Sequence, residues 1–413
     1  MRTMKGTSLL LILTSLALSG CSVNEVVTAQ ETELIMAQAP PDEALLLDIG
    51  IIHFKEGVPS KNDSADSGIF EEIRSAESRY LAYHLKTTLQ GTGHWGAVRV
   101  VPSRNTHTDV IISGTIKESD GEFIVLQITV GDARGQQWYR RNYSTQTGIS
   151  SYSMNRDRRQ DPYQKVFNDI ANDLRAYVAQ LPPKIIQQVR QVSELQFFAD
   201  MSPRAFGEHL ATDVDGLVTP VRLPAQNDPS VDRLRQIRER DRLVVDTLNE
   251  HYANFYYGIA IPYHSWRKTA REEAINYRQV KRASTMQILM GAVVLAGSLA
   301  VDTESGSRQT RNINRSLRNI GLSQGFETIF SGFSRRSEAS MHLEAIAELS
   351  ESFGAEAAPM VVTVEGQTRR LTGTAAAQYE SWRRLLKEIY EAETGFVDSA
   401  DVSAPERVPE PTG

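Results

Sequence analysis

Short apolar runs separated by turn signals fill residues 44–145, and this pattern restricts the fold more than any other feature of the chain. Residues 44–54 are mostly apolar, as in a strand buried on both faces. Residues 69–89 place apolar side chains on one broad helical face, and Gly91 and Gly93 then end the helix. Further strands are expected at residues 97–101, 109–116, 123–130 and 136–145. This order predicts an amino-terminal α/β sandwich-like domain over residues 44–150.

The chain after this domain is expected to be mainly helical, which makes the whole an α+β protein. A helical region is predicted over residues 160–355, with helices at 163–180, 184–200, 231–258 and 265–301. Pro262 is expected to interrupt the last two, because proline has no amide hydrogen for the helical ladder. Residues 356–395 predict a small β-hairpin followed by an amphipathic helix at 375–394. Residues 396–413 are expected to form a disordered tail.

The amino terminus has the pattern of an export signal. A short positive segment precedes an apolar run at residues 8–18, which is too short to cross a membrane. The run ends in Leu-Ser-Gly-Cys at residues 18–21 and resembles the lipobox of bacterial lipoproteins, in which the cysteine carries the lipid. Residues 1–20 are then the signal peptide, Cys21 the palmitate-bearing residue and 21–43 a tether. The alternative is an ordinary signal peptide with a stray cysteine.

The residue after Cys21 also bears on location. It is Ser22 rather than the aspartate that favours retention at the inner membrane in lipoprotein sorting. The resemblance therefore implies an outer-membrane protein, lipid-anchored and facing the periplasm. Acyl chains buried at ~0.8 kcal/mol per CH₂ would hold the chain to outer-membrane lipid.

Residues 44–147 resemble a group of bacterial envelope domains. The group includes the curli-secretion lipoprotein, the penicillin-binding-protein activator lipoproteins and the amino-terminal domain of the Tol-system translocation protein. The likeness lies in the order of elements, in Ser113-Gly114 within one strand, and in the Val-Gly-Asp-Ala turn at residues 130–133. It covers about 110 of the 413 residues. The resemblance implies a role in an envelope assembly.

Residues 286–301 form a run of sixteen residues without a charge. Small residues at Gly291, Ala292, Ala296 and Gly297 would allow another helix to approach closely. A membrane-spanning helix usually needs about 20 apolar residues, so the run is short for that role. It predicts either a buried or oligomer-contact helix or a segment inserted in a membrane.

A second candidate contact follows this run. Arg308, Arg311, Arg315 and Arg318 are three and four residues apart, which places them on one face of a helix. Such a face is either solvated and paired with acidic neighbours or in contact with anionic lipid or an acidic partner. Aromatic residues also gather between 252 and 266, and are predicted to be core rather than a glycan platform.

The sequence gives little support for catalysis. Its one cysteine excludes a disulfide framework within the chain, and its eight histidines lack metal-ligand spacing. Gly321-Leu-Ser323-Gln-Gly325 matches a hydrolase nucleophile pattern, but the residues before it are polar and helical rather than a strand. No catalytic residue, metal or cofactor is therefore predicted. The net charge of −6 argues against nucleic-acid binding.

These observations predict a non-catalytic outer-membrane lipoprotein that acts as a periplasmic scaffold or assembly subunit of a cell-envelope complex. Its partners would be outer-membrane lipid through Cys21 and a periplasmic or outer-membrane protein, a second copy included. One alternative is a homo-oligomeric secretion-channel component resembling the curli-secretion lipoprotein. Another is an activator of a cell-wall synthase.

Overall fold

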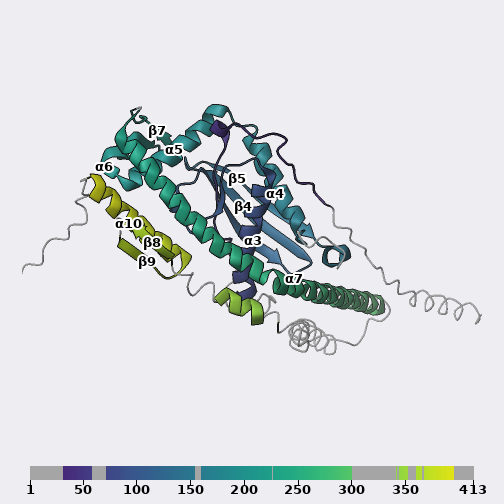
Figure 1. Cartoon of the computed structure of the whole chain (residues 1–413). Helices are drawn as coiled ribbons and strands as arrows, with labels where there is room; N and C mark the ends of the chain where they lie inside the picture. Colours follow the sequence, from purple (N-terminus) through teal and green to yellow (C-terminus); the bar gives the residue numbers. More distant parts are fainter. Residues whose placement is uncertain are drawn as a thin grey trace, which may run out of the picture.

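The protein has an α+β fold in which a mixed sheet is covered by helices, and one very long helix extends away from it (Figure 1). The computed structural model describes residues 31–57, 71–153, 160–225, 227–299, 341, 344–351, 360–364 and 367–394. Short 3₁₀ segments lie at η1 (Glu43–Leu45), η2 (Arg104–Thr106), η3 (Ile149–Tyr152) and η4 (Gly207–His209).

The elements follow one another along the chain as predicted, although the first strand covers only Ile49–Ile51 of the expected residues 44–54. The main sheet contains β1 (Ile49–Ile51), β2 (Val98–Val100), β3 (Val110–Ser119), β4 (Phe123–Asp132) and β5 (Gln137–Gln146), arranged β2-β1-β3-β4-β5. Helix α3 (Glu71–Thr92) links β1 to the parallel strand β2, as a crossover between parallel neighbours requires. Strand β3 also pairs in parallel with β1, whereas β3, β4 and β5 form an antiparallel meander.

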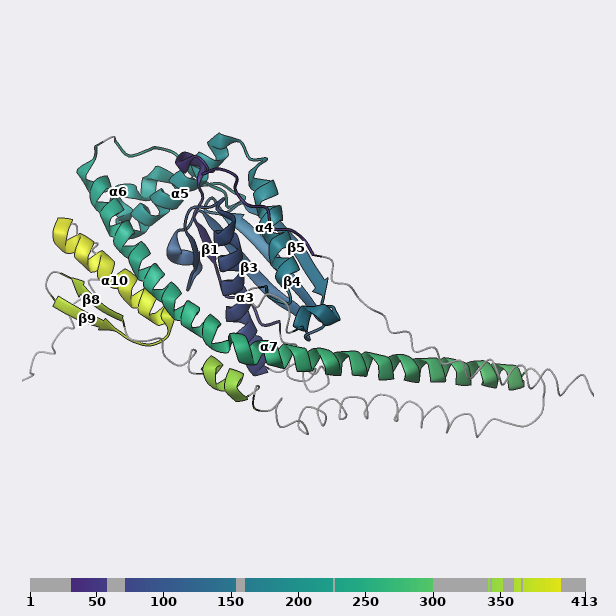
Figure 2. The same ribbon diagram turned by 45° about the vertical axis from the view of Figure 1, so that its right-hand side comes forward.

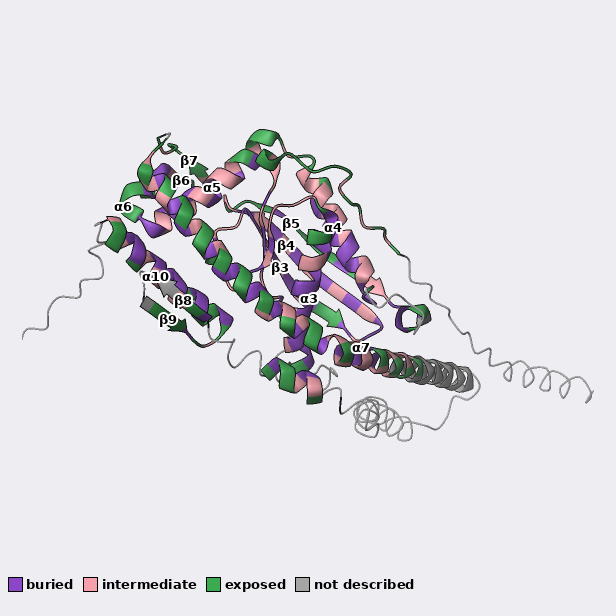
Figure 3. Ribbon diagram, in the orientation of Figure 1, coloured by how far each residue is buried: buried purple, intermediate pink, exposed green. Residues whose placement is uncertain are grey.

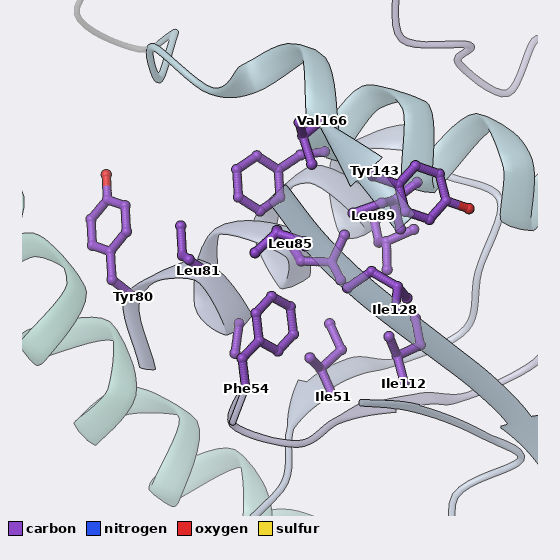
Figure 4. Close-up of a cluster of buried hydrophobic side chains, with 14 of the residues drawn as sticks. Ile51, Phe54, Tyr80, Leu81, Leu85, Leu89, Ile112, Ile128, Tyr143 and Val166 are labelled. Carbon is purple, nitrogen blue, oxygen red and sulfur yellow. The ribbon is translucent and has the colours of Figure 1, made fainter. Parts of the chain in front are cut away.

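Two faces of this sheet differ in burial. Along β4, and along β3 as far as Ile116, every second residue is buried and the residues between them are partly exposed (Figure 3). The buried face packs against α3 and α4 (Gln164–Val178). Figure 4 shows Leu81, Leu85 and Val166 over Ile112 and Ile128, with Phe54 closing one side. Because buried and partly exposed residues alternate along these strands, one face of the sheet lies in the core and the other face is partly exposed.

The core continues past the amino-terminal domain. Residues of α4, of α5 (Pro183–Met201) and of α7 (Pro229–Leu299) belong to the same buried cluster as the sheet, among them Val189 and Ile259. The core therefore includes residues from both sides of the boundary predicted between residues 150 and 160.

Helix α7 is one continuous helix of 71 residues, so the predicted interruption at Pro262 is wrong. The helix begins where expected, because Asp228 caps it by accepting from the Ser230 amide at 2.9 Å, next to Pro229. Pro262 leaves the Gly258 carbonyl without its helical donor, but Gly258 is exposed and water can replace that bond. Proline is a usual cause of helix bends, and Figure 2 shows α7 changing direction along its length.

A second buried cluster lies where the end of the described chain packs against α5 and the first half of α7. It includes the predicted hairpin, β8 (Met360–Val364) with β9 (Gln367–Leu371), and α10 (Ala375–Thr394). The short elements α6 (Pro203–Phe206), β6 (Leu210–Thr212) and β7 (Val218–Pro220) connect α5 to α7. A helical segment at residues 344–351 lies beside α7 in Figures 1 and 2.

Candidate interaction site: the root of the long helix and the amino-terminal strap

A buried ion pair fastens α7 to the rest of the protein. Both terminal nitrogens of Arg267 in α7 donate to the two carboxylate oxygens of Asp161, at 2.8 and 2.9 Å. Their side chains are 1% and 3% exposed. The Tyr80 hydroxyl in α3 donates to the same carboxylate at 2.9 Å. Because a buried charge without its partner is very costly, this pair fixes where α7 meets α3 and the start of α4.

The environment of the pair keeps Asp161 ionised. Burial alone would raise the pKa of this carboxyl, but the Arg267 charge and the hydrogen bonds from Arg267 and the Tyr163 amide outweigh burial and lower it. The guanidinium also lies 4.1 Å from the ring centre of Tyr263 and 5.0 Å from that of Tyr163. Aromatic faces attract a cation, and this attraction offsets part of the desolvation cost.

A second buried carboxylate supports the first. Glu77 in α3 accepts from the Tyr263 hydroxyl at 2.7 Å and from the Ser119 hydroxyl at 2.6 Å. Arg74 pairs with Glu77 at 3.2 Å. Glu77 therefore ties α7, the end of β3 and α3 into one network.

His84, which is also buried, makes a separate set of hydrogen bonds at the same place. Its Nδ1 is 2.7 Å from the Tyr256 hydroxyl and its Nε2 is 2.8 Å from Oε1 of Gln164. The Gln164 amide nitrogen donates to Thr88 and Asn168, so its oxygen is left to accept from Nε2 of His84. Burial lowers the pKa of His84, which favours the neutral ring. The ring thus joins α3, α4 and α7.

The turn between β3 and β4 lies directly against the α7 backbone. Gly121 has a φ of +85°, and a Cβ there would be 2.2 Å from the Arg267 carbonyl oxygen. Arg278 then pairs with Asp120 at 2.9 Å and with Glu122. Contacts from Tyr256 to Arg278 therefore hold about six turns of α7 on the main sheet and the helices that cover it, which are called the body below.

Residues 31–37, the amino-terminal strap, dock along α4. The Asn168 amide donates to the Thr32 carbonyl at 2.7 Å, and the Asn172 amide donates to the Glu33 carbonyl at 2.9 Å. Asn172 also accepts from the Ile35 amide at 3.0 Å. A tether was predicted for residues 21–43. Residues 31–37 of it dock on α4, because two asparagines one helical turn apart bind its backbone.

Several predicted site residues have no described side chain. Cys21, the arginines at 308, 311, 315 and 318, and Ser323 lie outside the described residues. Gly291, Ala292, Ala296 and Gly297 lie on the described course of α7, but only its backbone is described there. Among the described helices none is long and apolar enough to cross a membrane.

The predicted aromatic cluster is largely core. Tyr252, Phe255, Tyr263 and Trp266 are buried, which confirms that prediction, whereas Tyr257 is 66% exposed. Within the described ranges no group of acidic, histidine or cysteine side chains is placed to hold a metal ion.

Sequence reasoning missed the buried network at the root of α7. Asp161 and Arg267 are 106 positions apart, and each looks like an ordinary surface charge in the sequence. The sequence signal that could have indicated this network is Arg267, an arginine that directly follows the aromatic residues gathered between 252 and 266. Comparisons with protein-family models, curated proteins and solved structures find no match. The resemblance of residues 44–147 to envelope domains therefore stays a prediction.

Proposed function

We propose that the protein is a non-catalytic, lipid-anchored scaffold subunit of a cell-envelope complex, held at the outer membrane through Cys21 and facing the periplasm. In this proposal α7 presents residues 286–299 to a protein partner, either another envelope protein or a second copy of the chain. Its body positions that helix.

The observation that carries the proposal is that α7 is fixed to the body between Tyr256 and Arg278 and extends well beyond its last described contact. The last described contact to the body is Arg278, and the helix continues for 21 residues to Leu299, about 30 Å at 1.5 Å per residue. Figures 1 and 2 both show this half leaving the sheet and its helices. A helix that only completed the core could end near Arg278. A helix that binds a partner has to extend past the body, and residues 286–299 of α7 are called the arm below.

The strap adds a constraint on position. Cys21 and Glu31 are ten positions apart, and a fully extended chain of that length spans about 35 Å. An anchored lipid would therefore keep the body close to the membrane. In both Figure 1 and Figure 2 the first residues of the strap and the far half of α7 lie on the same side of the body. The arm would then act near the membrane surface.

The anchor is tested by exporting the full chain with Cys21→Ser behind a cleavable signal and measuring its mass by light scattering without detergent. We expect release from the membrane fraction and a monomer or small oligomer. Membrane attachment that persists without Cys21 would refute the anchor. A large ring that needs detergent would refute the scaffold and favour a secretion channel.

The arm is tested with bulky substitutions on its small-residue face. Ala292→Leu with Ala296→Leu should reduce recovery of cross-linked partner from cells at least about fivefold, because leucine prevents close helix contact. Val294→Phe, on the opposite side of the helix from both alanines at 100° per residue, is the matched control and should leave recovery unchanged. Equal recovery from all three forms would refute a role for this face.

A further inference from the structure

The open face of the sheet holds a groove that the scaffold role does not use. It has a volume of about 650 Å³, within the range of small-molecule sites. Strands β3, β4 and β5 form its floor, the loop between β2 and β3 forms one wall, and residues of α5 and β6 close the others.

Two arginines and two hydroxyls form a row across the floor. Strand register places Ser113 of β3 opposite Thr129 of β4, and Thr129 opposite Arg140 of β5. Arg140 Nε donates to the Thr129 hydroxyl at 3.1 Å, and at the other end Arg104 Nη2 donates to the Ser113 hydroxyl at 3.3 Å. Each hydroxyl accepts from an arginine, so its own hydrogen remains able to donate into the groove. The row therefore presents four side chains that all offer donors.

The acidic side chain that lines the groove does not cancel this charge. The Asp132 carboxylate is fully buried and accepts from Arg134 Nε and Nη2 and from the Trp138 ring nitrogen. The lining histidine, His107, contributes little positive charge, because burial lowers its pKa. The lining thus carries the uncompensated charges of Arg104 and Arg140.

The loop that carries Arg104 is held in place. His107 has a φ of 47°, a conformation that non-glycine residues rarely adopt. Its carbonyl accepts from the Ser193 hydroxyl at 2.6 Å and from Arg238 at 3.1 Å. Ser103 caps the same loop through the Asn105 amide. Sites that hold their donors in advance spend less free energy on ordering when a ligand binds.

We propose that this groove binds an anionic ligand through an oxyanion, a phosphate or a carboxylate, received by Arg104, Ser113, Thr129 and Arg140. Guanidinium groups match the geometry of both anions and form strong charge-assisted hydrogen bonds with them. Ile111 and Leu210 line the same groove and would contact an apolar part of the ligand. The site is independent of the lipid anchor and of the α7 arm.

Calorimetric titration of the exported Cys21→Ser protein at low salt tests the proposal, with inorganic pyrophosphate and citrate as probes. We expect binding of at least one probe, and which of them binds identifies the preferred oxyanion. Arg104→Gln and Arg140→Gln should each weaken binding about tenfold or more, the effect of losing one charge-assisted hydrogen bond. Thr129→Val should weaken it without changing the charge.

The matched control is Arg141→Gln. Arg141 neighbours Arg140 on β5, but its side chain pairs with Asp173 of α4 at 2.7 Å, on the other face of the sheet. Binding that Arg141→Gln leaves unchanged while Arg140→Gln weakens it supports the site. Equal losses in both variants would show a general charge effect and overturn the proposal, as would the absence of binding of either probe at about 10 mM.

Discussion

His53 shows how a single side chain couples the stability of this protein to pH. Its ring lies between the sheet and α7, edge-on to Tyr252 with ring centres 4.9 Å apart. Burial, assisted by the nearby charge of Arg79, lowers the pKa of His53 from 6.5 to about 4. The folded protein therefore keeps this ring neutral at a pH where the unfolded chain would protonate it.

The sign of the effect follows from proton binding. Between pH 6.5 and 4 the unfolded state binds more protons at this position, so stability is complete above 6.5 and is lost as the pH falls toward 4. Between pH 7 and pH 5, His53 should account for about 2 kcal/mol of the loss in unfolding free energy. Urea denaturation at both pH values should show a smaller loss, by about that amount, for His53→Gln than for the wild type.

His84 and His107 act in the same direction, since burial lowers the pKa of each. The variant should therefore keep part of the pH dependence. An unchanged difference between pH 7 and pH 5 in His53→Gln would show that this ring is not the group responsible.

Among the elements, the turn between β3 and β4 is the one that approaches the backbone of α7 most directly, and it helps to position that helix. Gly121→Ala would force an unfavourable backbone conformation and a clash with the Arg267 carbonyl, at a cost of about 3 kcal/mol. Thermal unfolding should show a clear decrease in Tm.

Gly258→Ala is the control on α7 itself. No atom lies within 4 Å of a Cβ at that position, and alanine favours a helix, so we expect a gain of about 0.5–1 kcal/mol. If both substitutions lowered Tm equally, the close approach of the turn to α7 would not be the cause.

A helix or strand could be predicted from the sequence where residues close together in the chain decide the local structure. The strand at Phe123–Asp132 and the helix at Ala375–Thr394 follow local alternation and helical spacing, and both were predicted within two residues. The effect of Pro262 was misjudged, because a helix continues through a proline where the residue four positions earlier is exposed and water can bind its carbonyl. The docking of the strap was not predicted, because its partners Asn168 and Asn172 are more than 130 positions away.

At the scale of the whole molecule, the strap sets where the body begins relative to an anchor. Asn168→Ala with Asn172→Ala should release residues 31–37, because their backbone groups then lose three hydrogen bonds to α4. Hydrogen exchange followed by mass spectrometry should show faster exchange over this segment while α3 and β4 stay protected.

Replacement of the exposed Asn254 by alanine is the control and should leave exchange in the strap unchanged. A strap that stays protected in the double variant would mean that Leu34 and the Ala37–Thr92 backbone bond hold it without the asparagines.

The described chain departs from the body along α7 and rejoins it at residues 344–351. Arg79 of α3 contacts both segments. Its guanidinium lies 5.9 Å from the Phe255 ring of α7 and donates to the Ser350 hydroxyl at 2.9 Å. Ile346 is fully buried in the same core. In engineering terms, a cut or a replacement placed between residues 279 and 343 should leave the core contacts of α7 and of residues 344–351 intact, because both sets of contacts lie outside that stretch of sequence.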